Sequence, residues 1–245
     1  MAGKKKFYTV RKGKQPGVFL KWDGPGGAKE QVSGFQGAEY RGFETRLEAE
    51  YYLQTGRLLP ASEVNAAEAG EGGDSGYTLD LATGKVVIFT DGASSGNPGP
   101  GGYGVVLLFG KERKELSAGF RCTTNNRMEL SACIAALQTL KRKSSVVIYS
   151  DSRYVVSAVQ QGWARRWQAN GWNRPPDASG QVFKAENVDL WQVMLDLLAK
   201  HEVEFRWVKG HASSRENERC DRLAVAAAKQ PNLPADPGFP VTACR

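Results

Sequence analysis

Two short apolar runs of the chain each end at an aspartate. Residues 86–90 read Val-Val-Ile-Phe-Thr before Asp91, and residues 146–150 read Val-Val-Ile-Tyr-Ser before Asp151. Continuous runs of this kind are typical of buried strands in a covered, commonly parallel sheet. If the two strands are parallel neighbours, both carboxylates lie at the carboxyl-terminal edge, where open α/β sheets bind their ligands. Close carboxylates must either take up a proton or share a cation, so the pattern indicates a divalent-metal site.

Two more acids occupy positions where a charge is costly. Glu129 and Asp221 each fall on an apolar stripe of a predicted helix, with small or apolar residues at helical spacing. A carboxylate in such surroundings is usually paired, neutralised or bound to metal. For either acid alone, the alternative is a residue at the edge of the stripe that reaches solvent. Oxygen ligands without nearby cysteines favour Mg²⁺ or Mn²⁺ over Zn²⁺.

Charge is distributed unevenly over the 245 residues, whose formal net charge is +7. Residues 1–60 contain 11 Lys or Arg and 6 Asp or Glu, whereas residues 61–80 contain 5 acids and no base. Two basic blocks separated by an acidic stretch favour a polyanionic partner that contacts both. The alternative is that the net charge only keeps the protein in solution.

The chain contains four cysteines, Cys122, Cys133, Cys220 and Cys244. They form no Cys-x-x-Cys pair and are not regularly spaced. We therefore expect buried thiols in a reducing compartment, with no zinc knuckle and no disulfide framework. The basic start lacks the apolar stretch of a signal peptide, and no run reaches transmembrane length. These features predict a soluble, cytoplasmic protein without a membrane partner. We also expect a monomer.

Hydrophobic patterning predicts two domains. Residues 1–58 contain candidate strands at 7–10, 18–22 and near 30–33, and a candidate helix at 45–55, which together form a small α+β domain. Residues 59–82 are rich in Ala, Gly and acids, and we expect them to form a flexible linker.

Residues 83–230 alternate strands and helices in a way that predicts a three-layer α/β domain with a five-stranded mixed sheet. The expected strands are 86–90, 102–109, 115–122, 146–150 and 203–208, and residues 110–113 form the turn of an antiparallel hairpin. The expected helices are 126–140, a helix from 152, 187–200 and 216–229. The Pro-rich residues 231–245 are expected to form a disordered tail.

Four motifs within residues 84–230 resemble, in the right order, those of type 1 ribonuclease H. They are Thr-Asp-Gly-Ala-Ser-Ser-Gly-Asn-Pro-Gly from residue 90, Thr-Thr-Asn-Asn-Arg-Met-Glu-Leu from 123, Ser-Asp-Ser from 150, and Lys-Gly-His from 209 with Glu-Asn-Glu-Arg-Cys-Asp from 216. The resemblance implies a ribonuclease H-like fold. It also implies that two Mg²⁺ ions, replaceable by Mn²⁺, are held by four acids: Asp91, Glu129, Asp151 and Asp221. His211 would then help to move protons or release product.

The activity implied by this resemblance is endonucleolytic hydrolysis of the RNA strand of RNA–DNA hybrids, leaving 3′-hydroxyl and 5′-phosphate ends. Two metal ions can activate water, stabilise the leaving oxygen and neutralise phosphate charge. Short amides suit the 2′-hydroxyl in the shallow minor groove, which indicates Asn97, Asn125 and Asn126. Helix capping is the alternative role for the last two. The resemblance also implies that Thr124 and Asn97 bind a DNA phosphate, and that Arg153 stands where the family often has glutamine.

A segment rich in tryptophan and arginine follows, with Trp163, Trp167 and Trp172 as its aromatic residues. Such a segment suits a protrusion that stacks on sugars and neutralises phosphates, and it is similar to the basic protrusion of bacterial members of the family. Residues 175–178, Pro-Pro-Asp-Ala, reduce its basic character. The alternative is that the tryptophans form a small local core.

The first domain resembles the hybrid-binding domain that precedes the nuclease in some members of the family. The matching segments are residues 7–13, 17–22 and 40–43. The resemblance implies that Tyr8 and Trp22 stack on the DNA strand and that Arg41 binds phosphate, while Gly42 replaces a second basic residue. The alternative is that both aromatic residues belong to the core of an inert domain.

Two other classes of function remain open at this point. A transposase or integrase also places acids at strand ends, but it would not require the first domain or the His211 motif. A non-catalytic hybrid-binding protein would not require the complete set of acids.

Overall fold

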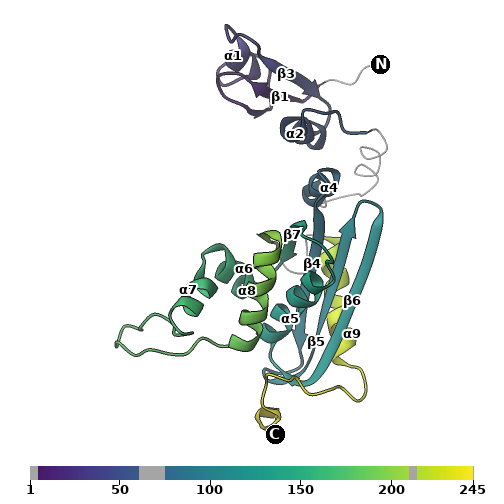
Figure 1. Cartoon of the computed structure of the whole chain (residues 1–245). Helices are drawn as coiled ribbons and strands as arrows, with labels where there is room; N and C mark the ends of the chain where they lie inside the picture. Colours follow the sequence, from purple (N-terminus) through teal and green to yellow (C-terminus); the bar gives the residue numbers. More distant parts are fainter. Residues whose placement is uncertain (1–4, 61–74, 210–213, 245) are drawn as a thin grey trace. The chain divides into compact units, whose positions relative to one another are not determined.

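The computed structural model describes residues 5–60, 75–209 and 214–244, and it divides the chain into two compact units, Met1–Gly84 and Lys85–Arg245. Figure 1 shows the elements of both units.

The first unit contains a three-stranded antiparallel sheet with the order β2-β1-β3. The helix α2 begins after Thr45, whose side chain accepts from the Glu48 backbone while the Glu48 carboxylate accepts from the Thr45 backbone, a capping box. Val10, Phe43 and other buried residues form the core. The elements are β1 (Phe7–Lys12), β2 (Gly17–Phe19), α1 (Ala28–Val32), β3 (Glu39–Phe43) and α2 (Arg46–Thr55).

Two expectations for this unit are wrong. The segment near residues 30–33 belongs to helix α1, and the third strand lies at Glu39–Phe43 instead. Part of the expected flexible linker is helical: α4 spans Ser75–Ala82, contacts α2 and buries Asp80. The apolar Leu79 and Leu81 give this stretch enough side-chain surface to pack, unlike the Gly- and Glu-rich residues before it. Residues 61–74 lie outside the described part of the chain.

The second unit is built on a five-stranded mixed sheet with the order β6-β5-β4-β7-β8. An antiparallel meander runs through the first three strands, and the last two are parallel to β4. This confirms the expected hairpin and mixed sheet. The strands are β4 (Val86–Ser94), β5 (Gly99–Phe109), β6 (Glu112–Thr123), β7 (Ser145–Ser150) and β8 (Glu202–Trp207).

Helices pack closely on both faces of the sheet because β5 presents a glycine toward each face. A Cβ at Gly102 would meet the backbone of α9, and a Cβ at Gly101 would meet Met128 of α5, so both helices pack directly on the strand. In Figure 1, α5, α6 and α8 lie on one side of the sheet and α9 on the other. The helices are α5 (Asn125–Gln138), α6 (Arg153–Gln160), α7 (Trp163–Ala169), α8 (Val188–Lys200) and α9 (Arg215–Ala228). Among the described residues, none of the helices combines the length and apolar character needed to cross a bilayer.

The C-terminal segment, residues 231–244, corrects the expectation of a disordered tail. Its Pro234 carbonyl accepts from the Arg121 amide of the edge strand at 2.9 Å, and Asp236 is buried against the α5 side chain Arg127. The segment ends in a 3-10 turn, η1 (Val241–Cys244). The segment has few apolar residues, but it can dock because the buried Arg127 guanidinium forms an ion pair with Asp236.

The same segment corrects the expectation for two of the cysteines. Cys122 of β6 and Cys244 of η1 form a disulfide, whereas Cys133 and Cys220 are buried free thiols as expected. The pairing was hidden in the sequence because 122 positions separate the two residues.

Candidate active site

The parallel pairing of β4 and β7 brings the first two acids together. Val86 pairs with Val146, and the register continues without a shift to Thr90 and Ser150. Asp91 and Asp151, one residue further in each case, therefore emerge at the same edge of the sheet. This confirms the placement expected from the two apolar runs.

Glu129 joins them from the first turns of α5. One carboxylate oxygen from each of Asp91, Glu129 and Asp151 lies within 4.8 Å of the others. Glu129 is 5% exposed, and its Oε2 atom is buried without a hydrogen-bond partner. A buried, unpartnered carboxylate oxygen is costly unless a cation or proton satisfies it.

The pKa values of Asp91 and Glu129 are raised by burial and by the nearby acids. Burial, then the charges of Asp151 and Asp221, raise the pKa of Asp91 to about 7. Burial, then Asp91 and Asp151, also raise the pKa of Glu129 well above its ordinary value. A bound cation would relieve both effects, so the hard oxygen donors present here fit a divalent ion such as Mg²⁺.

Asp221, on α9, lies at the margin of the same site. It lines a cavity of about 510 Å³ together with the three central acids, and its charge acts on Asp91. It is not one of the three acids whose oxygens approach within 4.8 Å. His211 lies outside the described residues.

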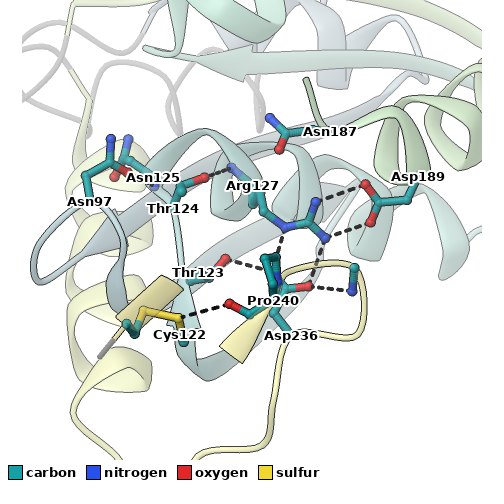
Figure 2. Close-up of polar contacts among 12 residues, drawn as sticks. Asn97, Cys122, Thr123, Thr124, Asn125, Arg127, Asn187, Asp189, Asp236 and Pro240 are labelled. Atoms are coloured by element: carbon teal, nitrogen blue, oxygen red, sulfur yellow. Dashed lines mark hydrogen bonds and ion pairs between the residues drawn. A yellow bond between two sulfur atoms is a disulfide. The ribbon is translucent and has the colours of Figure 1, made fainter. Parts of the chain in front are cut away.

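The polar residues expected to recognise the substrate surround these acids. The Asn97 side chain accepts from the Asn125 backbone amide at 3.1 Å, and Asn125 donates to Glu129 at 3.5 Å. Thr124 caps α5 by accepting from the Arg127 amide. Figure 2 shows Asn97, Thr124 and Asn125 close together at this helix start. Asn125 and Asn126 also line the cavity, so capping and an exposed binding surface coexist at this helix end.

Arg153 is exposed and lines the cavity, with its guanidinium 4.4 Å from the centre of the Trp207 ring. Trp207 was not among the predicted site residues, but its indole N–H donates to the Asp151 carbonyl at 3.1 Å. Its position at the end of β8, paired with Ser150 at the end of β7 just before Asp151, is the signal that could have indicated it.

The tryptophan-rich segment has features of both alternatives, a local core and an exposed binding surface. All three tryptophans are half-buried against the domain core. Trp163 and Trp167 also line an open cavity of about 660 Å³ with Arg166 and Arg174. The ring of Trp172 is not part of that lining.

In the first unit, Tyr8, Trp22 and Tyr40 form an aromatic cluster. The ring centres of Tyr8 and Trp22 are 5.6 Å apart, and those of Trp22 and Tyr40 are 5.1 Å apart. Arg41 is exposed on β3 next to the 49% exposed Tyr40. Tyr40 was not among the predicted binding residues, because the third strand was expected near residues 30–33 and not at Glu39–Phe43. The half-exposed rings suit a binding face better than a closed core.

Comparison with known proteins agrees with this geometry. Residues 83–229 match the RNase H family, and residues 6–53 match the ribonuclease H1 N-terminal domain. The chain belongs to the ribonuclease H family. It is an enzyme of that family that carries an N-terminal hybrid-binding domain.

Individual relatives of this ribonuclease H domain are closely similar. A ribonuclease H of Desulforamulus reducens is 61% identical over 152 residues, which is 62% of this chain and 92% of the relative. The ribonuclease HI of Synechocystis is 57% identical over 157 residues, covering 63% and 94%. The crystal structure of LC9-RNase H1, a type 1 enzyme with the type 2 active-site motif, matches with 33% identity and a TM-score of 0.51, covering 59% of this chain and 72% of that one.

Proposed function

We propose that this enzyme cleaves the RNA strand of RNA–DNA hybrids by two-metal-ion hydrolysis, leaving 3′-hydroxyl and 5′-phosphate ends. The observation that carries the proposal is the convergence of Asp91, Glu129 and Asp151 within 4.8 Å at one sheet edge, in a chain of the ribonuclease H family. Asp221 is proposed as a fourth ligand, because it lines the same cavity.

Bound divalent cations would supply an activated water and neutralise charge on the phosphate. The chain's own contribution is to hold the ligand oxygens in place. Asp91 accepts from the Gly92 amide at 2.8 Å, which fixes one of its oxygens, and the unpartnered Glu129 Oε2 keeps a lone pair available. The proposed role of His211 is to help move protons or release product.

Recognition of the hybrid would use the start of α5. Asn125 and Asn126 present amides beside the acids, where they can bond to RNA 2′-hydroxyls. Asn97 and Thr124 are proposed to bind a phosphate of the DNA strand. Arg153, with Trp163, Trp167 and Trp172 of the protruding segment, would extend the contact along the duplex.

The first unit would bind the same substrate without taking part in the chemistry. Tyr8 and Trp22 offer partly exposed rings for stacking, and Arg41 offers a cation for phosphate. A second binding domain on the same chain raises the effective concentration of hybrid at the nuclease. We also propose that the enzyme acts as a monomer in the cytoplasm.

The experiment that tests this proposal compares three labelled substrates of one sequence in Mg²⁺: hybrid, double-stranded RNA and double-stranded DNA. We expect cleavage of the RNA strand of the hybrid alone, loss of cleavage in EDTA and activity in Mn²⁺. Cleavage of plain DNA would favour a transposase-like enzyme, and an intact hybrid would favour a binding protein. Either result would overturn the proposal.

A further inference from the structure

The start of α5 carries several residues proposed for metal binding and substrate recognition, but the side chain of Arg127 in the same stretch points away from the site. Asn125, Asn126 and Glu129 line the cavity. Arg127 is not part of that lining, and its side chain points toward Asp189 and Asp236 instead (Figure 2). Its side chain is only 2% exposed. No step of the proposed chemistry uses this buried cation.

Arg127 is bound at both edges of its guanidinium. Nη1 and Nη2 donate to the two Asp189 oxygens at 2.9 and 2.7 Å, and Nε and Nη2 donate to the two Asp236 oxygens at 2.7 and 2.8 Å. Paired contacts of this kind fix orientation as well as position. The two acids belong to different elements, because Asp189 is on α8 and Asp236 is in the C-terminal segment.

The C-terminal segment is itself held in place at several points. Asp236 accepts from the Thr123 hydroxyl at 2.7 Å, and Pro234 accepts from the Arg121 amide at 2.9 Å. The Phe239 ring lies 5.8 Å from the Arg127 guanidinium. The disulfide of Cys244 with Cys122 ties the end of the segment to β6, just before α5 begins.

We propose that Arg127 is a positioning residue for the nuclease site, and that the C-terminal segment holds it in its working orientation. This inference rests on the proposed function. A helix turn moves as a unit, so a change in the anchoring of Arg127 shifts Asn125 and Glu129 together. Small displacements of groups that position a substrate lower activity strongly. The segment therefore acts on the site through Arg127 and the start of α5.

The disulfide contributes to this support. Reduction by dithiothreitol converts the cystine into the two thiols of Cys122 and Cys244, while the reagent is oxidised to its cyclic disulfide. Reduction leaves the ion pairs of Asp236 intact, so its effect should have the same direction as loss of the Asp236 charge but a smaller size.

The test uses the full chain with Asp236→Asn, which keeps the shape of the side chain and removes its charge. We expect the KM for hybrid and the Mg²⁺ concentration for half-maximal rate each to rise about fivefold to tenfold well below the melting temperature. Glu202→Gln is the matched control, because it removes an exposed ion pair with Lys143 at a distance of 2.8 Å. A purely structural role would lower the melting temperature and leave both constants unchanged.

Hydrogen exchange in the free protein gives a second readout that does not depend on cleavage. We expect faster exchange of the amides of residues 127–129 in Asp236→Asn, and unchanged exchange in α6. If that variant does not fold, Gly238→Ala replaces it, because its Cβ would press on Asp189 and Arg127 without changing any charge.

The positioning role would be overturned if the variant had the same KM, the same Mg²⁺ requirement and the same amide exchange as the wild-type protein. Failure of the wild-type chain to cleave hybrid would instead overturn the proposed function, and the exchange result would still decide the role of the C-terminal segment.

Discussion

At the scale of single residues, Asp91 is buried, and the charges of two other acids, Asp151 and Asp221, act on it. Replacing it by Asn removes the charge needed to hold a cation, and we expect kcat to fall by at least about a hundredfold. Hybrid binding, measured by fluorescence anisotropy, should survive because Asn97 and Thr124 remain. Asp196→Asn, on the exposed side of α8, is the control. Wild-type turnover in Asp91→Asn would contradict the ligand assignment.

The raised pKa of Asp91 makes the stability of the metal-free protein depend on pH. Its pKa is about 7 in the folded protein against 3.8 ordinarily, so between these values the folded state holds a proton that the unfolded state has lost. The contribution of Asp91 to the free energy of unfolding therefore falls as pH rises from about 4 to 7.

Chemical denaturation in EDTA measures this effect as the difference between the wild-type protein and Asp91→Asn. We expect the variant to gain about 1–3 kcal/mol relative to wild type between pH 4 and 8, and added Mg²⁺ to reduce the gap at pH 8. A difference that does not change with pH would show that the acids are not crowded in solution.

The residues of the site were predictable to different degrees. Asp91 and Asp151 could be placed because each follows an apolar strand, and Glu129 because it lies on an apolar helical stripe. Arg127 could not be recognised as buried, because its partners Asp189 and Asp236 are remote in the sequence. Trp207 was missed for a similar reason, since its contact with Asp151 depends on the pairing of β7 with β8.

At the scale of elements, the contact between β5 and α9 has no room for a side chain at Gly102. A Cβ there would lie 2.6 Å from the Ala224 carbonyl oxygen and from the Ala228 amide nitrogen. We expect Gly102→Ala to destabilise the domain by about 1–3 kcal/mol and to raise the Mg²⁺ requirement, because α9 carries Asp221.

Urea denaturation and cleavage at varied Mg²⁺ measure these two effects. Gly17→Ala is the matched control, since its Cβ would meet only the Phe19 ring, at 3.8 Å or more. Equal stability of the two variants would contradict the close packing of α9 on the sheet.

Regular elements with a strong apolar pattern were predictable, and docked irregular ones were not. The β4 and β7 strands and the hairpin of β5 and β6 lie where their Val, Ile and Leu residues place them. The strand β3 escaped prediction because its Arg41 and Gly42 interrupt the apolar alternation. The C-terminal segment looked disordered because polar contacts of Asp236 and Pro234 and a disulfide hold it, rather than a run of apolar side chains.

At the scale of the whole molecule, we propose that the first compact unit adds binding and the second carries out the chemistry. We expect a chain that begins at Lys85 to keep kcat within about twofold, and to show a KM for hybrid raised about tenfold, because it has lost the second binding domain. Steady-state cleavage of one hybrid by both chains measures this. Complete loss of activity at saturating hybrid would contradict the division.

The most direct measurement of the metal site is an anomalous-scattering map from crystals of the full chain soaked in MnCl₂. We expect manganese peaks within coordination distance of the Asp91, Glu129 and Asp151 oxygens, with Asp221 facing them. The same soak of Asp91→Asn crystals should show weaker peaks or none. Wild-type crystals without manganese between these three carboxylates would contradict the proposed catalytic centre.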